Sequence, residues 1–105
     1  MSDFNEYQRW TRETAIYPAD KSIEYCGLKL CSEAGEVAGK IGKWVRGDKQ
    51  LQRDEVCKEL GDVLWYVARL ADDLEINLSD VAEMNRGKLM SRKHRGVIKG
   101  DGDER

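Results

Sequence analysis

The chain has 105 residues, of which 40% are apolar and 36% are charged, and its formal net charge is −2. This length accommodates one domain, which we expect over residues 1–105, with 97–105 forming a loop or tail. A single proline suits helices better than sheets, and no apolar run is long enough for an export signal or a membrane span. A chain this short buries only about 60–65% of its unfolded surface, so we expect self-association to a dimer or tetramer.

The three cysteines are Cys26, Cys31 and Cys57. They are odd in number and lack the Cys-x-x-Cys spacing of a zinc site. We therefore expect reduced thiols, buried as small apolar side chains, in a cytoplasmic protein.

Four helices are expected in chain order, over about residues 3–14, 22–45, 52–74 and 79–93. Pro18 biases Tyr17 away from helical geometry and separates the first two. Gly47 and Asp48 end the second helix, and Ser79 is a suitable cap for the fourth. The pattern predicts an all-α protein, a bundle of four to five helices.

The two central helices each carry an apolar stripe in which residues alternate at spacings of four and three. This spacing predicts two antiparallel helices that pack at a shallow angle. The stripes are Leu30, Ala34, Val37, Ile41 and Trp44, then Val56, Leu60, Val63, Val67, Leu70 and Leu74.

A short phrase, Cys-x-Glu-x-Gly-acid-Val, occurs at residues 31–37 and again at 57–63. It places Glu33 with Glu36, and Glu59 with Asp62, on one face of each helix. Four facing acids would repel one another unless a cation lay between them. Ligation by carboxylates alone favours Mg²⁺, with Mn²⁺ as a substitute. A di-iron site would need Glu-x-x-His repeats, and the one histidine is His94; the remaining alternative is a solvated charged face.

Glycines lie between the two acids of each pair, at Gly35 and Gly61. A glycine inside a helix costs about 1 kcal/mol relative to alanine. Two readings stay open: close packing of the helices, or close approach of a ligand or partner at a shared site.

The acid pairs and the sequence around them resemble the MazG-like nucleotide pyrophosphohydrolases, all-helical enzymes related to the dimeric dUTPases. The resemblance covers nearly the whole chain. It rests on the two acid pairs, on Tyr17-Pro18, and on the segments at residues 59–66, 85–92 and 95–103. Many members have a further glutamate where this chain has Ser32, so the number of bound metals stays open.

The resemblance implies hydrolysis of a nucleoside triphosphate between its α- and β-phosphates, giving a monophosphate and pyrophosphate. Glu33, Glu36, Glu59 and Asp62 would hold Mg²⁺, and one of them would accept the proton of the attacking water. The expected substrate contacts are Asn85, Lys88, Arg92 and Arg95 on one face of the last helix, Tyr66 and Tyr17 against the base, and Lys40 near the phosphates. Lys40 and Lys43 could equally offset the neighbouring acids. Trp44 and Trp65 are expected in the core or in a subunit interface, and Met84 and Met90 in packing.

Two other functions stay open at this stage. One is a non-catalytic helical interaction module with an acidic groove. The other is a nucleic-acid binder that uses the basic segment 86–105, which carries seven Lys or Arg against three acids. The preferred base and sugar, the catalytic base and the choice between dimer and tetramer are not determined by the sequence.

Overall fold

The computed structural model describes residues 3–105, and this range contains helices and no strand. The order is α1 (Phe4–Thr11), η1 (Arg12–Thr14), η2 (Ala19–Lys21), α2 (Ser22–Arg46), α3 (Arg53–Asp73) and α4 (Leu78–His94). The all-α class is confirmed, with four α-helices. The first helix ends earlier than expected because its last three residues tighten into the 3₁₀ turn η1.

Local signals explain most of the helix ends. The side chain of Asp3 accepts a hydrogen bond from the Glu6 N–H at 2.7 Å and so caps α1. Gly47 ends α2 with φ of +88°, and its N–H and that of Asp48 bond back to carbonyl groups of the last turn. A left-handed residue at this position favours glycine.

The start of α4 depends on tertiary contacts. Its N-cap is Asn77 and not the expected Ser79. The N–H of Leu78 donates to Gln8 Oε1 and that of Ser79 to Asn5 Oδ1, each at 3.0 Å. Side chains of α1 thus satisfy the free N–H groups of α4, which lets the helix begin earlier.

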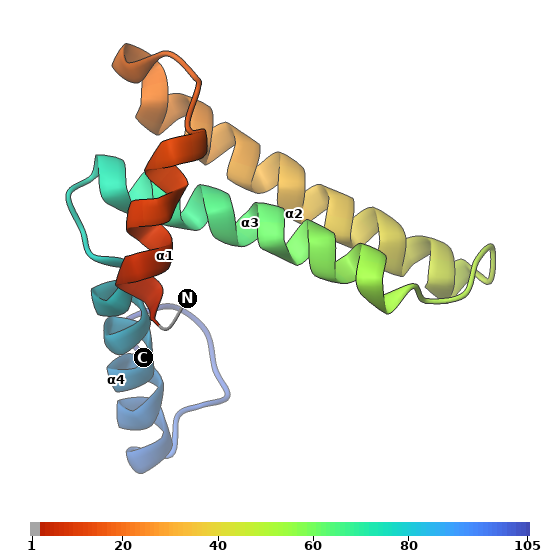
Figure 1. Ribbon diagram of the computed structural model, residues 1–105. Helices are drawn as coiled ribbons and strands as arrows, with labels where there is room; N and C mark the ends of the chain where they lie inside the picture. The colour runs from red at the N-terminus through yellow and green to blue at the C-terminus, as the bar shows by residue number, and fades with distance from the viewer. Residues whose placement is uncertain (1–2) are drawn as a thin grey trace.

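The elements form an open arrangement. Helices α2 and α3 run side by side as a long antiparallel hairpin, α1 crosses its base, and α4 projects from that base away from the hairpin tip (Figure 1). The radius of gyration is 16.4 Å, whereas a compact domain of this length has about 13 Å. One copy is therefore far from spherical.

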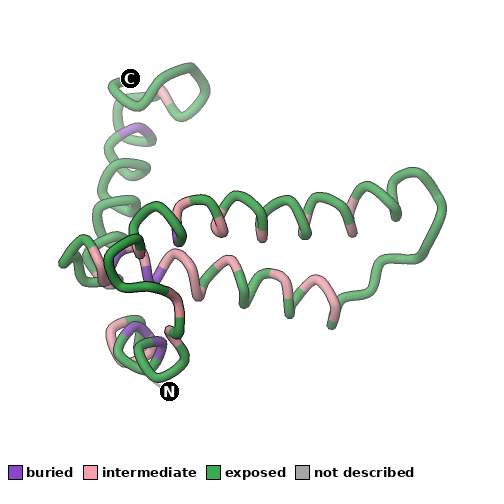
Figure 2. The backbone as a smooth tube through the Cα atoms, turned by 90° about the horizontal axis from the view of Figure 1, so that it is seen from above, coloured by how far each residue is buried: buried purple, intermediate pink, exposed green. Residues whose placement is uncertain are grey.

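Apart from Arg92 near the end of α4, the buried residues among those described gather where α1, the beginning of α2, α3 and the start of α4 meet, a region we call the junction (Figure 2). Its buried members are Gln8, Thr11, Cys26, Ala68, Arg69, Ala71 and Leu78. The hairpin arm beyond it contains no buried residue from position 27 to 67. The core is therefore small and confined to one end.

Arg69 of α3 is the central polar group of the junction, with 6% of its surface exposed. It donates to the Tyr17 hydroxyl at 3.0 Å, to Asp72 at 2.8 Å and to Asp73 at 3.2 Å. Arg12 also donates two hydrogen bonds to Asp72, at 2.8 and 2.9 Å. Because a buried charge is costly without partners, this network explains how an arginine is tolerated there.

Several apolar side chains lie on the surface instead of in a core. Met84 is 74% exposed and Met90 39% exposed, so within one chain the expectation that they pack is wrong. Cys31 and Cys57 are also exposed, and of the three free thiols only Cys26 is buried. The hairpin and α4 are too open for one chain to cover these side chains. None of the helices over residues 3–105 combines the length and apolar character that a bilayer crossing needs.

Candidate functional site

Three of the four expected metal ligands come together on the facing sides of α2 and α3. Glu33, Glu59 and Asp62 each offer a carboxylate oxygen, and these oxygens lie within 4.8 Å of one another. Glu33 and Glu59 are partly buried and Asp62 is exposed. We call these three residues the acid cluster. Glu36, one turn after Glu33 on α2, is exposed and outside this group.

Two lysines lie beside the acid cluster. Lys29 Nζ is 3.4 Å from Glu33, and Lys40 Nζ is 3.9 Å from Glu59. Both contacts offset part of the repulsion among the carboxylates. Lys40 was expected either at phosphate or beside the acids, and in this structure it is beside the acids.

The donor atoms of the acid cluster fit a hard divalent cation. Carboxylate oxygens are the ligands that Mg²⁺ prefers, and two ligands at its usual distance of about 2.1 Å lie about 3.0 to 4.2 Å apart. The oxygens here are within 4.8 Å of one another. Movement of these flexible side chains toward one another would therefore let them share one ion, with water or phosphate oxygens completing its shell.

The glycines between the acids leave open space. A Cβ atom at Gly35 or Gly61 would have no atom within 4 Å other than its chain neighbours and the nearby backbone of its own helix. Close packing between helices of one chain therefore does not explain these glycines. The other reading, approach of a ligand or of a second chain, stays a prediction.

Four aromatic side chains pack together between the acid cluster and the junction. Tyr17 stacks on Tyr25 with ring centroids 5.1 Å apart, and Trp65 meets Tyr66 edge to face at 4.9 Å. Tyr17 also contacts Trp65, and Tyr25 contacts Tyr66, both at 6.2 Å. We call Tyr17, Tyr25, Trp65 and Tyr66 the aromatic group. Trp65 also donates to Thr14 at 2.9 Å, which ties the group to η1.

Two tyrosines report on the electrostatics of the cluster. Burial raises the pKa of the Tyr66 hydroxyl, with further contributions from a hydrogen bond with Tyr25 and from the charge of Glu33. Burial and the charge of Asp62 raise the pKa of Tyr7 on α1. Both phenols therefore stay protonated beside the carboxylates and are available as hydrogen-bond donors.

Tyr17 is held by the junction. Burial is the largest cause that raises its pKa to about 12. Its hydroxyl accepts from Arg69 at 3.0 Å and lies 3.4 Å from Asp73. The hydroxyl of Tyr17 is therefore occupied, while its ring belongs to the aromatic group.

The expected substrate contacts on α4 lie apart from the acid cluster within one chain, because α4 projects away from the hairpin (Figures 1 and 2). Asn85 and Lys88 are exposed and line a shallow apolar hollow with Ile76, Val81 and Met84. One copy does not bring these residues to the carboxylates.

Three basic residues in the second half of α4 and just after it contact the C-terminal segment. Lys88 and Arg92 each lie 3.2 Å from Asp103, and these contacts lower the pKa of that carboxyl. Arg92 is 4% exposed, and Arg95 donates to the carbonyl of Arg105 at 2.7 Å. Much of the positive charge in segment 86–105 is thus used internally, which weakens the nucleic-acid interpretation.

Sequence reasoning missed several residues around the site. Lys29 precedes Glu33 by four positions, a spacing that predicts an ion pair. Tyr7 and Tyr25 had no comparable signal, because their position depends on how α1 and α2 meet α3. Glu55 pairs with Lys40 at 3.8 Å and with Lys49 at 3.6 Å, a set that only the hairpin turn brings together.

This geometry can neutralise and orient a polyanion. Three carboxylates suited to a divalent cation lie between an aromatic surface on one side and Lys40 on the other. Such a combination suits a phosphorylated ligand with an aromatic ring, since the cation neutralises phosphate and the rings contact a base.

Comparison with known proteins agrees with this chemistry. A family model described as MazG nucleotide pyrophosphohydrolase domain matches residues 21–97. Gene 37 protein of Mycobacterium phage L5 is 46% identical over 110 residues, which span 94% of this chain and 96% of the phage protein. The uncharacterized protein YvdC of Bacillus subtilis (strain 168) is 28% identical over 93 residues, which span 88% of each chain. No solved structure matches.

Proposed function

Because this chain belongs to the MazG nucleotide pyrophosphohydrolase family, we propose that it hydrolyses a nucleoside triphosphate to a monophosphate and pyrophosphate in a reaction that depends on Mg²⁺. The observation that carries the proposal is the acid cluster, in which Glu33, Glu59 and Asp62 converge from two helices. Mn²⁺ would be able to replace Mg²⁺, since both prefer oxygen ligands. The reaction would take place in the cytoplasm.

The acid cluster would hold the divalent cation, and Glu36 would join it as a fourth ligand. The bound cation would supply charge neutralisation at the phosphates and a lowered pKa for water. One carboxylate would accept the proton of the water that attacks the α-phosphorus. The bond from that phosphorus to the bridging oxygen then breaks, and pyrophosphate leaves with the oxygen.

The aromatic group supports contact with the base. Tyr66 follows Asp62 by four positions on α3 and carries a hydroxyl that stays protonated. Tyr25 is 38% exposed, so its ring has a face free to meet a ligand. We place the base against Tyr66 and Tyr25, with the Tyr17 ring supporting them from behind.

The open shape of one copy supports self-association. The chain exposes 7868 Å², whereas a compact monomer of 12.0 kDa exposes about 6,000 Å². The excess is about twice the surface that each partner contributes to a stable interface, about 800 Å². Exposed apolar residues are concentrated on the hairpin and α4, among them Leu60, Trp44 and Met84. We propose that a second copy covers this surface, giving a dimer or tetramer.

Association would also explain the residues of α4. Asn85 and Lys88 reach the substrate in this proposal only if a second copy carries them to the acid cluster. Arg92 and Arg95 would then hold the C-terminal segment in place and contribute to binding indirectly. Sedimentation or light scattering should give the mass of a dimer or a tetramer of the 12.0 kDa chain. A monomer at micromolar concentration would contradict this part of the proposal.

A panel of canonical and damaged nucleoside triphosphates, assayed with Mg²⁺ for pyrophosphate and phosphate separately, tests the function. We expect pyrophosphate from at least one of them and no release without a divalent cation. Glu59→Gln should abolish that release, while Glu75→Gln, at an exposed residue after α3, should not. Release of phosphate alone would contradict the proposed bond cleavage. No turnover of any nucleotide would contradict the proposal and favour a non-catalytic interaction module.

A further inference from the structure

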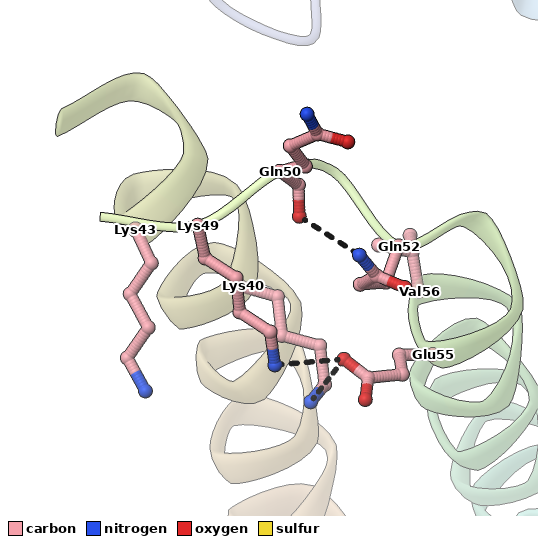
Figure 3. A pocket seen from close by; sticks show the side chains of 7 residues that line it. All are labelled: Lys40, Lys43, Lys49, Gln50, Gln52, Glu55 and Val56. Carbon is pink, nitrogen blue, oxygen red and sulfur yellow. Dashed lines mark hydrogen bonds and ion pairs between the residues drawn. The ribbon is translucent and has the colours of Figure 1, made fainter. Parts of the chain in front are cut away.

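A second charged site lies at the tip of the hairpin, one turn from the acid cluster. A pocket there is lined by Lys40, Lys43, Lys49, Gln50, Gln52, Glu55 and Val56 (Figure 3). We call it the lysine pocket. It joins the last turns of α2, the connecting loop and the first turn of α3, so residues distant in sequence share one wall.

The pocket is positively charged. Its three lysines outweigh its single acid, Glu55, and leave a formal charge of +2. Glu55 lies 3.8 Å from Lys40 Nζ and 3.6 Å from Lys49 Nζ. Within residues 3–105, Lys43 forms no ion pair. The positive charge of the lysines thus exceeds the negative charge that the protein places beside them, which is typical of a site for an anion.

The loop geometry holds these lysines in place. The left-handed Gly47 ends α2, and the N–H of Asp48 bonds back to the Lys43 carbonyl at 3.0 Å. The chain then turns so that Lys49 faces Glu55 of the next helix (Figure 3). An anion entering here would meet ammonium groups from two different segments of the chain.

Lys40 connects the lysine pocket to the acid cluster. The same Nζ atom lies 3.8 Å from Glu55 and 3.9 Å from Glu59. The two sites are therefore continuous, and the carboxylates of the cluster lie between the lysine pocket and the aromatic group. A ligand that spans all three would have a fixed direction along the hairpin.

We infer that the lysine pocket binds the terminal phosphates of the nucleotide, the part that leaves as pyrophosphate. This inference rests on the proposed function. The base would lie at the aromatic group, the α-phosphate at the acid cluster, and the β- and γ-phosphates against Lys43 and Lys49. When the bond to the α-phosphorus breaks, its electron pair stays with the pyrophosphate, and the lysines neutralise that charge.

Glu55 has a separate role in this arrangement. It pairs with Lys40 and Lys49 and competes with phosphate for the same ammonium groups. Its carboxylate therefore weakens product binding, so pyrophosphate can leave after each turnover. Removing its charge should tighten the binding of pyrophosphate.

Inhibition by the two products distinguishes this pocket from the rest of the site. In the variant Lys43→Gln/Lys49→Gln, the inhibition constant of pyrophosphate and the KM of the triphosphate should each rise roughly a hundredfold, since each of the two charged contacts contributes about tenfold. The inhibition constant of the monophosphate should stay within about twofold. Glu55→Gln should lower the inhibition constant of pyrophosphate several-fold. Lys93→Gln, which removes an exposed lysine on α4, is the matched control.

Two results would overturn the inference while the proposed function stands. One is an active wild type whose pyrophosphate inhibition does not change in the double lysine variant. The other is an equal loss of affinity for monophosphate and pyrophosphate, which would indicate a general charge effect. If the wild type releases no pyrophosphate from any triphosphate, the proposed function fails. In that case, calorimetry with Mg²⁺ and tripolyphosphate tests phosphate binding by the lysine pocket separately. Weaker binding by the double lysine variant than by the wild type would support the pocket, and equal binding would overturn it.

Discussion

The junction and the hairpin arm of this molecule are built in opposite ways. In the junction, buried polar groups such as Gln8 and Arg69 have partners within the chain. In the arm, three carboxylates converge and three lysines line a pocket, and none of these six residues is buried. The contrast teaches that one end of the molecule holds the buried contacts that stabilise the fold, while the other end leaves its charged groups accessible to a ligand.

The largest effect we expect is the loss of activity when the acid cluster is changed. Glu33→Gln should lower kcat/KM by roughly 10³-fold, because a metal ligand contributes several kcal/mol to transition-state stabilisation. The same substitution at Glu36, which lies outside the cluster, measures whether this residue joins the ligands when metal binds. An equal loss of kcat/KM at both positions would indicate four metal ligands. Full activity of Glu36→Gln would indicate that the metal has three ligands, those of the acid cluster.

The next effect concerns the junction. Arg69→Met should lower the free energy of unfolding by about 3–5 kcal/mol, because it leaves partly buried Asp73 without its arginine partner and leaves Asp72 with Arg12 alone. For a domain of this size each kcal/mol corresponds to about 4–8 °C in melting temperature. Arg53→Met, at an exposed arginine in the first turn of α3, provides the control. Similar melting temperatures for the two variants would mean that the junction does not dominate stability.

Metal binding should stabilise the arm. Mg²⁺ at 100 times its dissociation constant should raise the free energy of unfolding by about 2.7 kcal/mol, since it binds the folded site and not the unfolded chain. In Glu33→Gln this rise should be smaller, and the metal-free variant should melt above the metal-free wild type because one repulsive charge is gone. Melting curves with and without Mg²⁺ test both statements. An identical curve for the wild type in both conditions would contradict a preformed site.

The smallest effect is a dependence of stability on pH. Hydrogen bonds from Arg12, followed by those from Arg69, hold the pKa of Asp72 below its usual value in the folded state. The unfolded chain therefore binds the proton more readily, so Asp72 contributes stability above about pH 4 and loses it as pH falls through its folded pKa. Asp72→Asn should cost about 1–3 kcal/mol at pH 7.

The cost of Asp72→Asn should shrink when the pH is lowered to 3, because Asp72 of the unfolded wild type then binds a proton and the charged carboxyl contributes less to stability. Urea unfolding at the two pH values measures this difference. Asp101→Asn, at an exposed aspartate of the C-terminal segment, should show no comparable change. If Asp72→Asn lowers the free energy of unfolding equally at pH 7 and pH 3, the loss comes from the altered side-chain shape and not from the lost charge.

Local patterns predicted much of this molecule. The alternating stripes and the end signal at Gly47 placed α2 and α3 to within a residue or two, because helix geometry depends on neighbours three and four positions apart. The duplicated acid pairs predicted which residues would converge, since the hairpin aligns the two copies. Three of those four residues do so.

The remaining features depend on contacts between distant segments. Neither the start of α4 at Leu78, set by the side chains of Gln8 and Asn5, nor the contact of Arg69 with Tyr17 could be predicted from periodicity. The lysine pocket likewise needs the loop to bring Lys49 against Glu55.

The sequence by itself determined the helices, the chemistry of the acid pairs and the family resemblance, because these depend on residue type and short spacing. The tertiary structure alone decided that Arg69 holds the junction together, that Cys31 and Cys57 are exposed, and that α4 points away from the acids. Those outcomes depend on how helices meet, and packing free energy is summed over residues far apart in the chain.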